Sequence, residues 1–335
     1  MNHVIEVENL TKLYGRPETG VLAVDHLNFE VFHGEIFGFL GPNGAGKTTT
    51  QRMLTTLLAP TEGKILINGH DLSRDSYLAK RQIGLVPEES NVYTELTAWD
   101  NLMFTASLYR VPRLERAKRA QELLETFGLW EKRDMKAENF SKGMRRRLSI
   151  AMAIIHKPAL LFLDEPTPGL DAQSIRSIWE LIRSMNADGT TIFLSTHQIE
   201  EANQLCGRVA IISHGKIAAI DTPEQLKANF RRTQSVEVAF EGELAEKSSG
   251  LAELLGVNTQ VKVGDKMRLY TEDPSALLPR LIQYAESHAL RIISLNTLGP
   301  SLEDVFLEIT GGQVGAVGNE SQNDKPARRG MGGRK

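Results

Sequence analysis

GPNGAGKT, residues 41–48, is the stretch of sequence that decides the fold of this chain. It follows an apolar run, residues 36–40, and a segment compatible with a helix begins near Lys47. The stretch matches in full the pattern G-x-x-x-x-G-K-[ST] of a phosphate-binding loop. Glycines let the backbone turn tightly, so that successive N–H groups surround a β-phosphate, and the following helix adds its positive N-terminal end. A glycine turn that merely precedes a lysine would not account for the strand and the helix on either side.

Two side chains at the end of this loop carry specific chemistry. Lys47 supplies a positive charge to the β- and γ-phosphates, and the Thr48 hydroxyl can ligate Mg²⁺. The residues predicted to contact the nucleotide through the loop are Gly41, Pro42, Asn43, Gly44, Ala45, Gly46, Lys47, Thr48 and Thr49.

A second apolar run, residues 159–163, ends in two adjacent acids, Asp164 and Glu165. Successive residues of a strand point to opposite sides, so the two carboxylates should have different roles. Asp164 is the candidate for the Mg²⁺ shell, held through water, and Glu165 is the candidate general base or orienting group for the attacking water. Alone, such a pair more often marks a helix start. After a phosphate-binding loop it predicts a hydrolytic site.

Composition sets limits on the class of protein. Of the 335 residues, 41% are hydrophobic and 24% charged, the balance of a globular protein, and a net charge of −3 gives no electrostatic case for nucleic acid as the main partner. The one cysteine, Cys206, rules out an intrachain disulfide, makes a reducing compartment the default, and is expected to be an inert buried thiol. No run approaches the roughly 18 apolar residues of a membrane span, and no secretory signal is expected. Work at a membrane would therefore require a separate membrane-spanning chain.

The apolar pattern predicts an α/β core. Leu27, Phe29 and Val31 alternate with polar residues, as in a sheet with one buried face. Residues 160–163, 192–194 and 209–212 are fully apolar, as in a parallel sheet covered by helices on both faces. Residues 94–156 should be largely helical, with Thr97 and Asp100 as a capping pair and a break at Pro112.

The character of the sequence changes after about residue 225. Strands are predicted at residues 236–240, 260–263, 267–270 and 292–295, with a hairpin turn at 264–266 and helices at 277–285 and 302–309. We therefore expect three regions: a nucleotide-binding domain (1–225), a small α+β accessory domain (226–311), and a disordered glycine-rich, basic tail (312–335).

A third motif, FSKGM at residues 140–144, precedes the two acids and resembles the LSGGQ signature of the ABC ATPase family. Ser141 and Gly143 match the signature, whereas Phe140, Lys142 and Met144 depart from it. The resemblance implies a fold with a mixed-sheet core, an antiparallel β subdomain and a helical signature subdomain. It also implies that Ser141, Lys142 and Gly143 meet the γ-phosphate of ATP held by a second ATPase subunit, in a head-to-tail dimer.

Further matches follow the family's order. Asp171, in TPGLD, looks like the D-loop residue at the dimer seam, and His197 looks like the switch histidine that contacts the γ-phosphate. Tyr14 resembles the aromatic residue that stacks on adenine, with a packing residue at a strand end as an equal alternative. Glu88 stands where the family has the Q-loop glutamine. It can accept hydrogen bonds and attract Mg²⁺, but when ionised it cannot donate. We expect it to lie near the metal.

The signature and the ending SLEDVFLEITG, residues 301–311, look like ATPases of the ABC-2, daunorubicin-resistance-like exporter group. The resemblance implies a Mg²⁺-dependent ATPase on the cytoplasmic face of the membrane that energises export through a separate integral membrane permease, without a nucleic-acid partner. The alternative is a soluble ABC ATPase acting on ribosomes or DNA. Those resemble this chain less, because they carry two cassettes, long coiled coils or zinc-binding insertions. An unrelated P-loop kinase gives no reason for a signature ahead of the acids.

Overall fold

The computed structural model describes residues 3–229, 234–241, 251, 254, 256–299 and 301–311. Contacts divide the chain into two compact units, one of residues 1–231 and 301–310 and the other of residues 232–300 and 311–335. The expected tail, residues 312–335, lies outside the described residues.

The first unit is built around a six-stranded sheet in the order β10-β9-β3-β8-β7-β6. Neighbours from β9 to β6 are parallel, and β10 runs antiparallel to β9. The bounds are β3 Ile36–Leu40, β6 Ile83–Val86, β7 Leu160–Asp164, β8 Thr191–Thr196, β9 Arg208–Ser213 and β10 Lys216–Asp221. Every residue of β3, β7 and β8 is buried, which confirms that these strands are covered on both faces. The expectation that helices alone cover them is wrong, because a second sheet packs on one face.

A second, four-stranded antiparallel sheet has the order β2-β1-β4-β5. Its strands are β1 His3–Tyr14, β2 Val21–Phe32, β4 Glu62–Ile67 and β5 His70–Asp71. Leu27, Phe29 and Val31 are buried, as their alternation predicted. The Phe29 ring packs against those of Phe37 and Phe193, with centroids 5.8 and 6.3 Å apart, so aromatic side chains join the two sheets.

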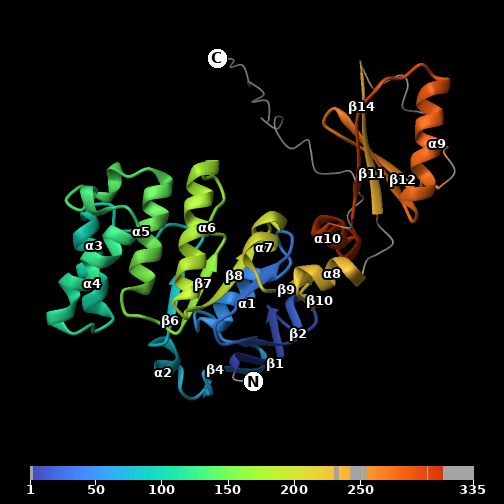
Figure 1. The fold of residues 1–335 in the computed structure, drawn as a ribbon. Coiled ribbons are helices and arrows are strands. Elements are labelled where there is room, and N and C mark those ends of the chain that lie inside the picture. Colours follow the sequence, from blue (N-terminus) through green and yellow to red (C-terminus); the bar gives the residue numbers. More distant parts are fainter. Residues whose placement is uncertain are drawn as a thin grey trace, which may run out of the picture. The chain divides into compact units, whose positions relative to one another are not determined.

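The helical part of the first unit lies mainly between β6 and β7. In Figure 1, α3 (Ala98–Leu108), α4 (Arg113–Thr126) and α5 (Lys142–Ile154) lie side by side. Thr97 caps α3 by accepting a hydrogen bond from the Asp100 N–H at 3.0 Å, and Pro112 separates α3 from α4, as expected. The remaining helices are α1 Lys47–Leu54, α2 Ser76–Lys80, α6 Ala172–Ala187, α7 Ile199–Leu205, α8 Pro223–Asn229 and the short 3₁₀ turns Trp130–Lys132 and Ala137–Asn139. Among the residues described, none of the helices is both long enough and apolar enough to cross a bilayer.

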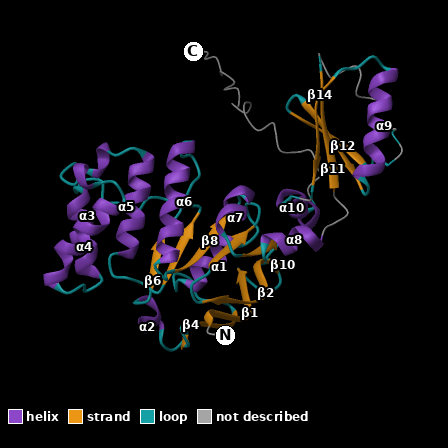
Figure 2. Cartoon of the chain, in the orientation of Figure 1, coloured by secondary structure: helices purple, strands orange, loops and turns teal. Residues whose placement is uncertain are grey.

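In its described residues, the second unit is an antiparallel sheet with helix α9 on one face, the α+β arrangement predicted from sequence (Figure 2). The sheet has the order β12-β13-β11-β14, with β11 Gln234–Phe240, β12 Thr259–Val263, β13 Lys266–Thr271 and β14 Ile292–Leu298. Helix α9, Pro274–Ser287, buries Leu277 and Leu281 in the same core as Val236 and Val238. Gly264, at φ 63°, opens the two-residue turn between β12 and β13.

The last helix, α10 (Leu302–Thr310), differs from the sequence-based expectation. We expected residues 302–309 within the accessory domain, but Leu302, Val305 and Phe306 share the core of the first unit with Leu226 of α8. Helix α8 was not predicted. A short amphipathic helix must bury its apolar stripe against some surface, and sequence periodicity does not say which one. The sheet of the second unit is thus connected at both ends to helices of the first.

Candidate functional site

The loop between β3 and α1 has the backbone that a phosphate cradle requires. Gly44 and Gly46 adopt φ values of 81° and 105°, in the left-handed region. A Cβ on Gly46 would lie 2.6 Å from the Ala23 carbonyl oxygen, so a larger residue does not fit. The Gly41 N–H donates to the Thr196 carbonyl at 3.3 Å, which joins the loop to the end of β8.

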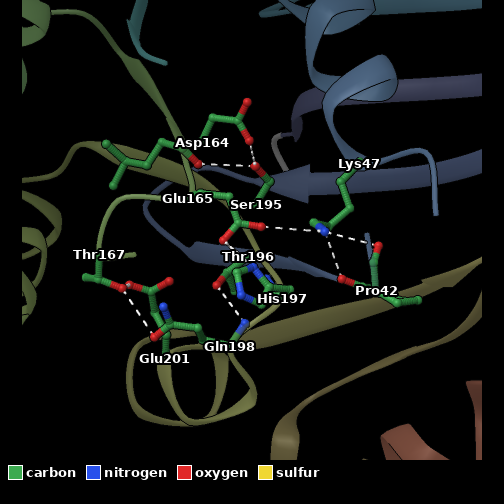
Figure 3. A network of polar contacts seen from close by, with 12 residues as sticks. Pro42, Lys47, Asp164, Glu165, Thr167, Ser195, Thr196, His197, Gln198 and Glu201 are labelled. Carbon is green, nitrogen blue, oxygen red and sulfur yellow. Dashed lines mark hydrogen bonds and ion pairs between the residues drawn. The ribbon is translucent and has the colours of Figure 1, made fainter. Parts of the chain in front are cut away.

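Lys47 is the buried cation of the loop. Its ammonium donates to the carbonyl oxygens of Gly41 at 2.8 Å and Pro42 at 3.2 Å, and lies 3.5 Å from Oε1 of Glu165 (Figure 3). Beside it is a cavity of about 230 Å³. The cavity is lined by Ala23, Asn43, Gly44, Gly46, Lys47, Thr48, Thr49, Glu88, Glu165, Pro168 and His197.

Glu165 is the second charged group of this cavity. It follows β7 with a φ of 45°, rare for a residue with a side chain, and its N–H donates to the Ser195 carbonyl at 2.9 Å. Its Oε2 lies 2.9 Å from Nδ1 of His197. The structure therefore brings together Lys47, Glu165 and His197, three residues that the sequence placed in one site from far-apart motifs.

Asp164 faces different partners, as the strand alternation predicted. Its Oδ1 accepts a hydrogen bond from the Ser195 hydroxyl at 2.5 Å, and the same hydroxyl lies 2.7 Å from the Gln51 amide oxygen. Burial raises the pKa of the Asp164 carboxyl, an effect opposed by the Ser195 hydrogen bond.

Three oxygen-bearing side chains, Thr48, Glu88 and Asp164, line one cavity of about 270 Å³. Hydroxyl and carboxylate oxygens are hard donors that suit Mg²⁺. Among the described residues, no group of three or more His, Cys, Asp or Glu side chains could hold a metal. A cation here would therefore need water or phosphate oxygens to complete its shell, as Mg²⁺ commonly does.

The signature segment forms the start of α5. Ser141 is the N-cap and accepts a hydrogen bond from the Met144 N–H at 3.2 Å, and Lys142 is exposed. Gly143 packs closely against α6: a Cβ there would lie 2.7 Å from the Ser174 hydroxyl oxygen, so the Ser174 side chain would have to move. Ser141 and Lys142 are thus presented at the surface beside a tightly packed helix pair.

Asp171 caps the neighbouring helix, α6. Its carboxylate accepts hydrogen bonds from the Ser174 N–H at 2.9 Å and the Ser174 hydroxyl at 2.7 Å, and these bonds lower its pKa. The structure thus gives Asp171 a local role that its motif did not indicate. Its expected place at a dimer seam stays a prediction.

Tyr14 is not brought to the phosphate cavity. It lies at the exposed end of β1, paired with Val21, and the Lys12 ammonium lies 5.5 Å from the centroid of its ring. Adenine stacking on Tyr14 stays a prediction.

Sequence reasoning missed several residues that support the site. Ser195 donates a hydrogen bond to Asp164, and the Gln51 amide oxygen contacts the Ser195 hydroxyl, as described above. Glu201 of α7 accepts hydrogen bonds from the Thr167 hydroxyl at 2.8 Å and the Trp179 indole at 3.2 Å, and burial raises its pKa. Glu201 thereby ties the turn after Glu165 to the helix after His197. Ser195 could have been suspected as a polar residue ending an apolar strand, whereas nothing in the spacing marks Glu201.

Known proteins resemble this chain along most of its length. Residues 24–168 match the ABC transporter family, and residues 222–310 match the C-terminal domain of DrrA1-3-like ATP-binding proteins. Linearmycin resistance ATP-binding protein LnrL of Bacillus subtilis (strain 168) is 36% identical over 310 residues, covering 92% of this chain and 98% of that protein. Daunorubicin/doxorubicin resistance ATP-binding protein DrrA of Streptomyces peucetius is 37% identical over 310 residues, covering 92% of each.

Solved structures give the same family. The dimeric, post-hydrolysis structure of the ATP-binding cassette MJ0796 bound to ADP and Pi matches with a TM-score of 0.59 at 29% identity, covering 65% of this chain and 98% of that one. An ATP binding subunit of an ABC transporter matches with a TM-score of 0.61 at 32% identity, covering 68% and 93%. The chain belongs to the ATP-binding proteins of ABC transporters, in the daunorubicin-resistance-like group. It is an ATP-hydrolysing subunit that energises transport, as its sequence predicted.

Proposed function

We propose that this chain binds ATP with Mg²⁺ at the β3–α1 loop, hydrolyses it with Glu165, and so drives export through a separate integral membrane permease. The observation that carries the proposal is the position of the Glu165 carboxylate, 3.5 Å from the Lys47 ammonium and 2.9 Å from His197 Nδ1 at one cavity. A terminal phosphate between loop and carboxylate would lie within reach of both a cation and a base.

Each residue has a distinct role in this chemistry. Lys47 and the loop amides neutralise the phosphate oxygens, on which negative charge is spread in the transition state. Glu165 orients the attacking water and accepts its proton. His197 holds the Glu165 carboxylate in place and contacts the γ-phosphate. Thr48, Asp164 and Glu88 would hold Mg²⁺, which supplies further neutralisation of the phosphate charge.

We further propose a head-to-tail dimer in which Ser141, Lys142 and Gly143 of one subunit face the ATP of the other. The exposed Ser141 and Lys142 at the N-terminus of α5 support this, because a helix N-terminus favours a phosphate. The related cassette MJ0796 is a dimer in its post-hydrolysis structure.

The permease would dock beside the Glu88 segment, on the cytoplasmic face of the membrane. Phe104 and Leu108, four residues apart on α3, are 42% and 60% exposed, and the Tyr93 ring meets Phe104 edge-on at 5.1 Å. Exposed aromatic side chains of this kind are typical of protein interfaces. The names of relatives support export: they include Nod factor export ATP-binding protein I of Ralstonia nicotianae, 36% identical over 311 residues, besides the two resistance proteins.

Co-expression with the permease encoded nearest its gene tests the proposal. We expect a stable complex whose ATPase rate responds to the permease in lipid vesicles. A double variant, Phe104→Ser with Leu108→Ser, should lose the complex while the isolated chain keeps its ATPase activity. Co-sedimentation with ribosomes or DNA in place of the permease would instead favour the soluble alternative.

A further inference from the structure

The guanidinium of Arg146, on the second turn of α5, bridges two loops of the active site. Nη1 donates to the Pro87 carbonyl at 2.7 Å, and Nη2 donates to the Glu88 carbonyl at 2.8 Å and the Glu165 carbonyl at 3.2 Å. The side chain is 8% exposed. Three backbone carbonyls from two segments thus converge on one buried cation.

The two segments are neighbours because of the sheet. Strands β6 and β7 are parallel, with Val86 paired to Leu163, so the turns that follow them leave the same edge side by side. A planar fork of five donors can satisfy several carbonyls there at once, which an ammonium on a flexible stem does less well.

The contact with Glu165 fixes an unusual backbone conformation. Glu165 has a φ of 45°, and its N–H is held on the other side by the Ser195 carbonyl at 2.9 Å. A residue persists in such a conformation only where its surroundings determine it from more than one direction. Arg146 supplies the second constraint, and the side chain so oriented reaches Lys47 and His197.

The electrostatic surroundings fit this position. Burial lowers the pKa of the Arg146 guanidinium, whereas the Asp164, Glu201 and Glu88 carboxylates oppose that shift. The guanidinium nevertheless keeps its charge. Removing the Arg146 side chain would leave the negative charges of those three carboxylates less well neutralised.

We propose that Arg146 is a positioning residue for ATP hydrolysis. From α5, it holds the Glu88 segment and the backbone of Glu165 in fixed positions relative to each other. It acts through its contacts with backbone carbonyls. Because Arg146 lies on the helix that Ser141 caps, movement of that helix is transmitted to the hydrolytic carboxylate. This inference rests on the proposed role of Glu165.

The test compares Arg146→Met with Arg147→Met in the purified full chain. Arg147 is the matched control, since its Nη1 donates to the Phe127 carbonyl at 3.0 Å, away from the site. We expect Arg146→Met to lower kcat by about 10²-fold, the effect of misplacing a catalytic group by about 1 Å. KM should change by less than about threefold, because the cradle is intact. Arg147→Met should retain wild-type kinetics, and Arg146→Lys, which keeps the charge and part of the hydrogen bonding, should recover part of the lost kcat.

A double variant separates positioning from general damage. In single-turnover hydrolysis, Arg146→Met should add little to the loss already caused by Glu165→Gln, because Arg146 acts through that residue. Three results would each overturn the proposal. The first is equal kcat values for Arg146→Met and Arg147→Met, and the second is a change in KM without a change in kcat. The third is a loss in the double variant equal to the product of the two single losses. If Arg146→Met does not fold, Arg146→Lys decides alone, and wild-type turnover in it refutes the inference. Normal turnover in Glu165→Gln would instead refute the assignment of Glu165, and this inference with it.

Discussion

Oε2 of Glu165 lies 2.9 Å from Nδ1 of His197, although 32 residues separate them in the chain. The contact follows from the pairing of β7 with β8, which sets Asp164 opposite Ser195 and so leaves the next residues of both strands at one edge of the sheet. The Lys47 ammonium lies 3.5 Å from Oε1 of Glu165. The Glu165 carboxylate therefore lies between a lysine and a histidine at the phosphate cavity. The residues predicted for hydrolysis are thus adjacent because of strand order.

Removal of the buried cation should strongly weaken ATP binding. Lys47→Ala takes away the only side-chain charge that the loop itself provides, and with it the hydrogen bonds to Gly41 and Pro42. Equilibrium binding of a fluorescent ATP analogue should weaken by about 10²-fold, the loss expected when about 3 kcal/mol of charge-assisted contact is removed. Lys64→Ala, a change outside the loop, is the control. Wild-type affinity in Lys47→Ala would show that the loop is not the phosphate site.

Asp164 should make the protein less stable at neutral pH than its amide variant. Burial raises the pKa of its carboxyl, so the folded chain holds this proton to higher pH than the unfolded chain does. Stability then falls as pH rises from the unfolded pKa, near 3.8, through the raised folded pKa. Asp164→Asn keeps an acceptor for Ser195 but has no charge to bury. Without nucleotide or metal, its unfolding midpoint should exceed that of the wild type at pH 7, and the difference should vanish near pH 4.

The matched control is Asp171→Asn, in which the pKa of the native carboxyl is lowered by its hydrogen bonds with Ser174. That variant should show no gain at pH 7. A lower unfolding midpoint for Asp164→Asn at neutral pH would mean that its charge is compensated in the fold.

His156 should destabilise the protein in acid. Burial lowers the pKa of its imidazole to about 4, and the ring is stacked on Tyr109 with centroids 3.9 Å apart. A lowered histidine pKa means that stability is lost as pH falls from about 6.5 to about 4. The loss attributable to this one group is about 3 kcal/mol. Urea unfolding at pH 7 and pH 4.5 should show a smaller drop for His156→Gln than for the wild type. The exposed His214→Gln is the control. An unchanged drop in His156→Gln would place the acid sensitivity elsewhere.

Helix α10 should stabilise the first unit. Leu302 is 2% exposed in a core shared with Leu205 and Leu226. Leu302→Ala should lower the free energy of unfolding by about 2–4 kcal/mol, the usual cost of a buried leucine. Hydrogen exchange should show weaker amide protection in α7 and β9, with β11 and β13 unaffected. The exposed Glu308→Ala provides the control. Loss of protection confined to β11 and β13 would place the helix with the second unit.

Much of the fold was predictable because its strongest signals are local. The glycine loop, the apolar strands at residues 160–163 and 192–194, the Thr97 cap and the hairpin at Gly264 each depend on a few adjacent residues. The placement of α10 was not predictable, because an apolar stripe gives burial without naming the surface that covers it.

The site shows the same division. Sequence motifs identified Lys47, Asp164, Glu165 and His197, and the structure brings these residues close together. Of their supports, Ser195 is marked only as a polar residue that ends an apolar strand, and Glu201 and Arg146 have no local signature, since their function depends on which groups the fold brings near. Asp171 and Tyr14 show the opposite case, in which a motif was visible but the surroundings of the residue were not.

The proposed hydrolysis depends most on Glu165, the group that directs water at the terminal phosphate. The most direct measurement is single-turnover hydrolysis of bound ATP by Glu165→Gln, with nucleotide affinity and dimerisation followed in the same preparation. We expect affinity near that of the wild type, hydrolysis slower by about 10²–10⁴-fold, the usual contribution of a general base, and an ATP-bound dimer that accumulates. Hydrolysis at close to the wild-type rate in this variant would contradict the central claim.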